Sequence, residues 1–408
     1  FQLVDALNQL IFSKRMTNYF YYLQIINYWF MKKYFILTAT LLHFLPLTIF
    51  ASFIFKPPLL LETIEVDFIN KTGDIIEGEY LDIEFMGGKS IAVFDTLLMV
   101  VTSNPEALLQ VYDTRTLEPL AMLCQQGRAK NEFTNNSIYE LSNQTFQRNG
   151  DVIVMVRGEG GYVIKEINIT ASIREGKTIV EGINNKIPYG CGDVYGINNE
   201  LTKIFVFNNH NYSLNREEFN PPTFSIIDEQ DSEVLEIYGR LVDFENKAYS
   251  TFWYNNNICK HPTKNIFVQC MNTMDYIHFI DLDNKKYYSI HQNGSPTFDE
   301  VYIPNKITNG VYEFDCEHFY ESIPAEDYFL VFFTNGDYRK KSIKNGNIKA
   351  AELLAFDWNG NYLGGVKMDI LAQDYTYDSK NKILYGYRIF DEKIIAYDLS
   401  EFVNSFAK

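Results

Sequence analysis

One mark recurs six times along this chain: an apolar strand that ends in Asp or Asn and is followed by a turn. The marked residues are Asp113, Asn168, Asp228, Asp281, Asp357 and Asp398. Side-chain oxygens of Asp and Asn accept hydrogen bonds from backbone N–H groups two residues on, which opens a turn. The apolar residues on either side then pair as a hairpin. The chain is therefore built from six repeated hairpin units.

A second apolar strand precedes each mark, and the spacing between the two strands is regular. Fifteen residues separate Leu98 from Asp113, and the same interval recurs in the second, fourth and sixth units. The third and fifth units carry insertions between these strands, at about residues 208–223 and 334–350. This spacing predicts four-stranded propeller blades with strands a to d from the axis outward, in which the paired strands are b and c.

We therefore predict an all-β protein, a six-bladed β-propeller of four-stranded antiparallel blades in one domain over residues 60–405. The last unit ends ten residues after Asp398 and leaves little room for a fourth strand. The segment Leu61–Phe68 alternates apolar and polar residues, so we expect it to join the last blade and close the ring. The alternative, two separate β domains, would not explain one spacing along the whole chain.

The N-terminal region has the pattern of an export signal. Met31 is followed by two lysines and an uncharged run of 22 residues, which is typical of a secretory signal. We predict that residues 1–30 lie upstream of the natural start and that residues 31–52 form a signal peptide or an uncleaved signal-anchor, since the run is long enough to span a bilayer. Both interpretations place the propeller in the periplasm or at the cell surface. Membrane contact is then expected only through an uncleaved anchor.

Charge and cysteine content exclude some classes of function. The chain has 52 acidic and 36 basic residues and a net charge of −16, whereas nucleic-acid binding needs clustered cations, so we expect no nucleic-acid partner. No pair of cysteines has the CxxC spacing of zinc or redox sites, and their disulfide state is left open. The cysteines are Cys124, Cys191, Cys259, Cys270 and Cys316.

The sequence contains no motif that identifies a catalytic centre. It has no GxSxG elbow, Walker loop, HExxH or EF-hand spacing. Carboxylates near the inner strands could bind calcium at the channel mouth, as in lactonase-type propellers. These are Asp151, Asp193, Asp315, Glu317 and Asp374. They share no motif, so we expect no cofactor, and a calcium-dependent lactonase- or lyase-like enzyme is the alternative.

The two insertions predict a binding face. In a propeller the b–c loops and d–a connections lie on the same face, and loops on a rigid scaffold often carry function. Aromatic and basic residues in these segments suit sugars, peptides or anionic groups. The candidates are Arg128, Tyr189, Tyr212, Trp253, Tyr254, Tyr338, Arg339 and Lys341. The sequence favours a non-enzymatic binding or interaction module for a protein, peptide or glycan of the cell envelope.

A turn after the first unit carries a resemblance to a known family. Residues 127–133 match the pattern Gly-x-Gly-Pro-Gly-Glu-Phe at Gly127, Glu132 and Phe133 but lack its middle glycines and proline. Over about residues 60–405 the chain resembles the TolB-like six-bladed propeller proteins exported by Bacteroidota. The resemblance implies this fold and export, but no reaction, because the family is mostly uncharacterised. Many members are lipoproteins, whereas this chain has no cysteine at the end of the apolar run.

Overall fold

All the described residues belong to one compact unit, Pro58–Lys408. The computed structural model describes residues 62–69, 73–134, 138, 144–158, 163–185, 187, 191–208, 223–228, 234–237, 256–272, 274–296, 318–334 and 352–407. The predicted upstream segment 1–30 and export signal 31–52 lie outside these ranges and stay predictions.

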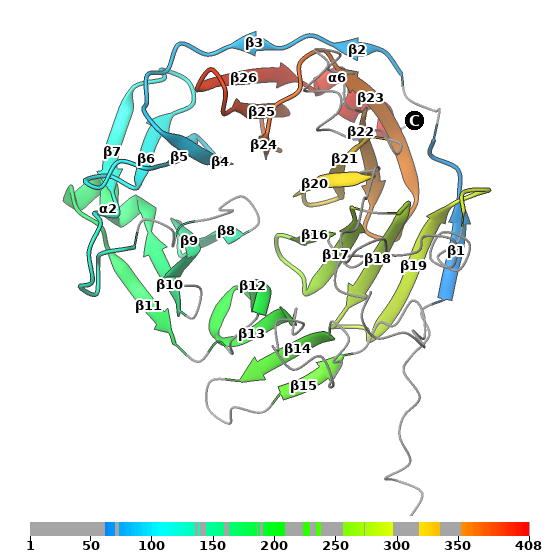
Figure 1. The fold of residues 1–408 in the computed structure, drawn as a ribbon, viewed down its shortest axis with the longest axis horizontal. Coiled ribbons are helices and arrows are strands. Elements are labelled where there is room, and N and C mark those ends of the chain that lie inside the picture. Colours follow the sequence, from blue (N-terminus) through cyan, green and yellow to red (C-terminus); the bar gives the residue numbers. More distant parts are fainter. Residues whose placement is uncertain are drawn as a thin grey trace, which may run out of the picture. The chain divides into compact units, whose positions relative to one another are not determined.

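Six antiparallel sheets surround a common centre and form a six-bladed β-propeller, which confirms the predicted fold class (Figure 1). Blade 1 contains β4 (Gly88–Phe94), β5 (Leu97–Thr102), β6 (Leu109–Asp113) and β7 (Pro119–Leu123). Blade 2 contains β8 (Thr145–Arg148), β9 (Asp151–Gly158), β10 (Val163–Asn168) and β11 (Val180–Asn184). Blade 3 contains β12 (Cys191–Ile197), β13 (Glu200–Asn208), β14 (Thr223–Asp228) and β15 (Val234–Ile237).

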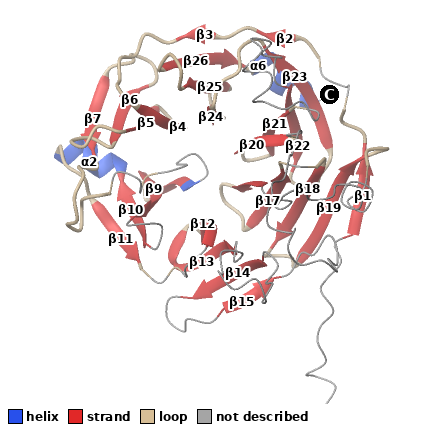
Figure 2. Ribbon diagram, in the orientation of Figure 1, coloured by secondary structure: helices blue, strands red, loops and turns tan. Residues whose placement is uncertain are grey.

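The second half of the ring continues in the same order from the centre outward. Blade 4 contains β16 (Asn256–Lys260), β17 (Ile266–Met271), β18 (Tyr276–Asp281) and β19 (Lys286–Gln292). Blade 5 contains β20 (Phe319–Pro324), β21 (Tyr328–Phe333), β22 (Glu352–Asp357) and β23 (Tyr362–Met368). Blade 6 contains β24 (Asp374–Asp378), β25 (Ile383–Arg388) and β26 (Lys393–Asp398). The described helices are short (Figure 2): α2 (Ile169–Glu175), α6 (Ser400–Asn404) and the 3₁₀ turn η4 (Ser405–Ala407).

Each of the six marked residues is the last residue of a strand c. Asp357 shows the expected chemistry, because its Oδ1 accepts from the N–H groups of Asn359 at 2.9 Å and Asn361 at 2.8 Å. The Asn168 side chain also accepts from a backbone N–H group, but at the start of a helix instead of a turn. Its Oδ1 accepts from the N–H of Ala171 at 2.8 Å and caps helix α2. The mark thus predicts where the strand ends, whereas the next element can be a turn or a helix.

The regular spacing of the sequence corresponds to strand register. Ile153 pairs with Asn168, and Ile383 pairs with Asp398, so the 15-residue interval measures one b–c hairpin. The two insertions lie between β13 and β14 and between β21 and β22, as predicted. Their own conformations fall outside the described residues.

The ring closes through the N-terminal segment, but the strand that does so is not the predicted one. The segment Leu61–Phe68 forms β1 (Glu62–Val66), which pairs in parallel with β19 of blade 4. Next, β2 (Ile75–Ile76) pairs in parallel with β23 of blade 5. Only β3 (Glu79–Tyr80) joins the last blade, antiparallel to β26 (Figure 1). The prediction for Leu61–Phe68 was wrong because alternation sets which face a strand buries, not which sheet edge it pairs with.

The described part of residues 62–80, which we call the N-terminal strap, is anchored by an aromatic side chain. Phe68 is fully buried, and its ring centroid lies 5.5–6.0 Å from those of Phe319, Phe333 and Phe356 in blade 5. The Gln292 Oε1 atom of blade 4 accepts from the Phe68 N–H at 2.8 Å. The strap therefore fastens blades 4 and 5 together before it reaches blade 6.

Six hydrophobic clusters form the core, one between each pair of neighbouring blades. The cluster between blades 6 and 1 closes the ring and contains Ile91, Val100, Tyr385 and Tyr387, all buried. The Tyr387 hydroxyl donates to Gly88 O at 2.8 Å across this interface. Each blade thus buries both of its faces against its neighbours.

Gly78 offers a test of ring closure. A Cβ added there would come within 2.4 Å of Ile395 Cγ2 and 2.5 Å of the Tyr397 ring, and both side chains are fully buried. We expect Gly78→Ala to push β3 away from blade 6 and lower the free energy of unfolding by about 1–3 kcal/mol. The measurement is denaturant unfolding, with the exposed neighbouring change Glu79→Ala as control. Equal stability of the two variants would contradict a role of β3 in closure.

Candidate functional site

The predicted binding residues fall mainly outside the described part of the chain. Arg128 is described: it is exposed, in the connection from blade 1 to blade 2. The others lie outside the described residues: Tyr189, Tyr212, Trp253, Tyr254, Tyr338, Arg339 and Lys341. The proposed binding face with the insertions therefore stays a prediction.

The turn at residues 127–133 connects blades 1 and 2 and has a structural role. Phe133 is fully buried, and Lys165 Nζ lies 4.6 Å from the centre of its ring. The same ammonium group donates to Glu132 O at 2.7 Å. A Cβ on Gly127 would lie 1.9 Å from the Glu132 carboxylate, so a larger residue there requires the Glu132 side chain to move. The three residues that match the family pattern thus shape the turn.

The described carboxylates among the calcium candidates are engaged in other contacts. Asp151 Oδ2 accepts from Asn168 Nδ2 at 2.8 Å, and Asp374 Oδ2 accepts from the Ile91 N–H at 2.6 Å. The side chains of Asp193, Asp315 and Glu317 lie outside the described residues. Within the described ranges, no three His, Cys, Asp or Glu side chains gather as a metal site. The alternative of a calcium-dependent lactonase- or lyase-like enzyme therefore stays a prediction.

The side chains of three of the five cysteines are described, and all three are free thiols. Cys124, Cys259 and Cys270 are fully buried, and burial raises the pKa of each thiol. A raised pKa disfavours the reactive thiolate. These cysteines therefore serve as small apolar core residues.

A cavity of about 470 Å³ is lined by residues of all six blades. Blades 3 to 6 contribute residues at or beside their a–b turns, blade 1 contributes the end of β4, and blade 2 contributes β8 and the residue before it. The residues are Val93, Phe94, Gln144, Thr145, Phe146, Gln147, Asn199, Lys260, His261, Pro262, Thr263, Ile323, Pro324, Ala325, Glu326, Thr376, Tyr377 and Ser379. The a–b turns lie at the opposite end of the blades from the b–c loops. We call this site the a–b cavity.

Lys260 ends β16 and supplies a buried positive charge to the a–b cavity. The residue is 5% exposed, and its Nζ donates to Asn199 Oδ1 at 2.9 Å and His261 O at 3.2 Å. Burial lowers the pKa of the ammonium to about 8, and the charge of Asp283 partly offsets this effect. The side chain is therefore still mainly protonated at neutral pH.

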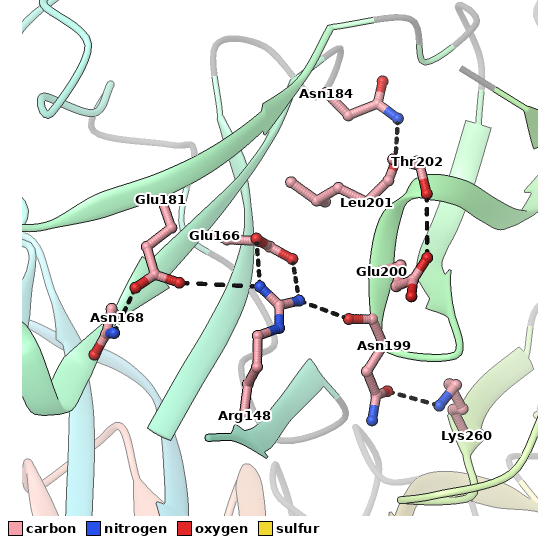
Figure 3. A network of polar contacts seen from close by, with 10 residues as sticks. All are labelled: Arg148, Glu166, Asn168, Glu181, Asn184, Asn199, Glu200, Leu201, Thr202 and Lys260. Carbon is pink, nitrogen blue, oxygen red and sulfur yellow. Dashed lines mark hydrogen bonds and ion pairs between the residues drawn. The ribbon is translucent and has the colours of Figure 1, made fainter. Parts of the chain in front are cut away.

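Asn199 is placed for this contact by a tight turn. Asn198 and Asn199 connect β12 to β13, and both have positive φ angles, 52° and 56°. Such a two-residue turn favours Asn, which tolerates the left-handed region. The turn also accepts a hydrogen bond from Arg148, whose Nη2 donates to Asn199 O at 2.8 Å. The same guanidinium group pairs with the Glu166 carboxylate (Figure 3). Polar contacts thus link blades 2, 3 and 4 behind the cavity wall.

His261 provides a buried hydrogen-bond donor next to Lys260. Its Nδ1 accepts from the N–H groups of Thr263 at 3.1 Å and Lys264 at 3.2 Å, so the proton of the neutral ring lies on Nε2. Nε2 has no acceptor among the described residues. The ring packs on Trp358, with centroids 4.8 Å apart. Burial is the main cause that lowers the His261 pKa to about 4, so the ring is neutral at pH 7.

The remaining wall is a mixture of amide, hydroxyl and apolar groups. Gln144 Nε2 donates to Val194 O, whereas its buried Oε1 has no partner within the described chain. Thr263 Oγ1 donates to Glu326 Oε1 at 2.8 Å. Phe94 and Phe146 add aromatic surface. The a–b cavity therefore offers both hydrogen-bonding and apolar contacts to one small molecule.

Sequence reasoning missed this site. A single Lys-His pair in a hairpin turn has no motif, and the six segments that form the wall are spread from residue 93 to residue 379. The segments of blades 3 to 6 share a position at the a–b turns of the repeat, and this was the only usable signal.

Comparisons with known proteins give only distant similarities. No family model matches the chain, and no curated protein is similar to it in sequence. A solved structure of a candidate exported protein from Bacteroides fragilis is similar at 11% identity, with 82% of this chain and 98% of that one covered and a TM-score of 0.48. A member of the DUF4221 family from Bacteroides vulgatus shows 10% identity, coverage of 79% and 95%, and a TM-score of 0.47.

The fold assignment therefore rests on the strand pairings of the chain itself. The TolB-like resemblance stays a prediction. Within the described ranges, no helix combines the length and apolarity needed to cross a membrane.

His261 predicts a loss of stability in acid. Its pKa is about 4 in the folded chain, below the ordinary value of 6.5, so the unfolded chain binds a proton first as the pH falls. The contribution is fully present above about pH 6.5 and is lost between there and pH 4. His278, with a pKa lowered to about 3, acts in the same direction.

His261→Asn keeps an acceptor near the Nδ1 position but cannot take up the proton. Between pH 7 and pH 4 we expect its free energy of unfolding to fall by about 2–3 kcal/mol less than that of the wild-type protein. Unfolding free energies measured from pH 7 to pH 4 provide the check, with Lys177→Gln, at an exposed residue outside the cavity wall, as control. An unchanged pH slope in His261→Asn would contradict the assignment.

Proposed function

We propose that this protein is an exported, non-enzymatic binding propeller that holds a small polar molecule in the a–b cavity. One observation carries the proposal: residues from all six blades form a single wall of about 470 Å³, within the usual size range of small-molecule sites. Two buried polar atoms of this wall, His261 Nε2 and Gln144 Oε1, have no partner among the described residues.

Unpartnered buried polar atoms are costly, by roughly 1–3 kcal/mol each. Both atoms have almost no accessible surface, so a ligand that accepts from one and donates to the other removes that cost only if the wall adjusts on binding. Such a wall therefore supports a binding role more directly than a structural one.

Export is part of this proposal and is supported by the signal pattern at residues 31–52. The proposed docking face for a protein, peptide or glycan of the envelope carries the insertions at 208–223 and 334–350. Because b–c and a–b connections lie at opposite ends of a blade, a partner on that face would leave the a–b cavity accessible.

The test is a screen for saturable binding of small polar molecules, including sugars, amino acids and nucleosides, by ligand-observed NMR. Ser379 is an exposed residue of the cavity wall, so Ser379→Trp should block the cavity without unfolding the protein. We expect this change to weaken binding at least tenfold. Asn359→Trp, at an exposed turn residue outside the wall, is the control.

Two outcomes would refute the proposal. One is that none of the small molecules binds. The other is that Ser379→Trp binds them as well as the control variant does.

A further inference from the structure

The Lys260 ammonium lies in the a–b cavity wall without a bonded anion among the described residues. Its two acceptors, Asn199 Oδ1 and His261 O, are neutral oxygens. An ammonium group has three N–H donors, so one donor has no acceptor in the described part of the chain. Asp283 offsets the cost of burying this charge only in part, and an anion in the cavity would therefore stabilise this group further.

His261 supplies a second donor from the next residue. The two backbone N–H groups bonded to Nδ1 fix the proton on Nε2. This donor is buried and unpartnered within the described ranges. Nε2 has almost no accessible surface, so it reaches a ligand only after a side chain of the wall shifts. A carboxylate, which has two acceptor oxygens, then matches both neighbouring donors.

The charge of the wall distinguishes a carboxylate from a phosphate. Among the residues that line the cavity, Lys260 is the one cation and Glu326 the one acid. Glu326 accepts from Thr263, and its negative charge disfavours a second negative charge on a ligand. A carboxylate carries one charge, whereas a phosphate ester carries about 1.5 to 2 at neutral pH. A single buried ammonium balances the one negative charge of a carboxylate better than the larger charge of a phosphate ester.

The rest of the wall indicates what the carboxylate is attached to. Amide and hydroxyl groups come from several blades, at Gln144, Gln147, Thr376 and Ser379. They suit a ligand with several hydroxyl groups, which donate and accept alternately. Phe94 and Phe146 provide surface for the apolar face of such a ring.

We propose that the ligand of the a–b cavity is a sugar acid, bound with its carboxylate against Lys260 and His261 and its hydroxyl groups toward the amides and hydroxyls of the neighbouring blades. This proposal rests on the proposed function and names the chemical class of its ligand.

The decisive experiment compares acids with neutral analogues of the same shape on the unmodified protein. Glucuronate, galacturonate and mannuronate are titrated beside their amides by calorimetry. We expect at least one acid to bind ten or more times tighter than its amide. This comparison requires no variant and is independent of any folding defect.

Variants then assign the carboxylate contact. Lys260→Met should abolish the preference for the acid over the amide, and His261→Asn should weaken binding of the acid about threefold to tenfold. Lys264→Met, an exposed lysine in the same turn but outside the wall, should bind like wild type. Thermal melting of each variant verifies that it is folded.

The outcomes separate the two proposals. If acids and amides bind equally, or if glucose 6-phosphate binds tighter than the acids, the sugar-acid proposal is wrong and the proposed function stands. If a preference for the acid survives in Lys260→Met, the assignment to this lysine is wrong. If no acid or amide binds while another molecule of the NMR screen does, the ligand class is wrong. If nothing in either experiment binds, both proposals fail.

Discussion

Every part of this structure depends on the closure of the ring between blades 6 and 1. A blade of four strands has two apolar faces, and each face is buried only by the next blade. Five of the six interfaces are joined by the chain as it proceeds, but the sixth brings together residues about 300 positions apart, such as Tyr387 and Gly88. The N-terminal strap connects the two blades through the chain, because β3 supplies the outer strand that blade 6 lacks and is followed by β4 of blade 1.

The strap does more than complete one sheet. It passes along the outer strands of blades 4, 5 and 6, and the buried Phe68 ring fixes it among aromatic side chains of blade 5. Two of its three pairings are parallel, which adds a fifth strand to blades that already have four. Outer edges that would otherwise be open to other chains are covered in these blades.

The a–b cavity is a consequence of the same closure. Its wall draws on all six blades, and the contact from the Val93 N–H to Thr376 Oγ1, at 2.9 Å, lies in the wall and crosses the closing interface. Lys260 and His261 stay buried because blades 3 and 5 pack beside them. Opening the ring would separate Val93 from Thr376 and so break the wall of the proposed binding site.

The sequence by itself determined the blades. Asp and Asn at the strand ends bond to N–H groups only a few residues away, so hairpin position, b–c register and the number of repeats are local properties, readable from Asp113 to Asp398. Tertiary structure decided the rest. Which sheet edge receives Leu61–Phe68 depends on the edges left open by residues more than 200 positions away. The grouping of Lys260 with Asn199, Gln144 and Ser379 likewise arises only when segments of six blades come together, and no local pattern encodes that arrangement.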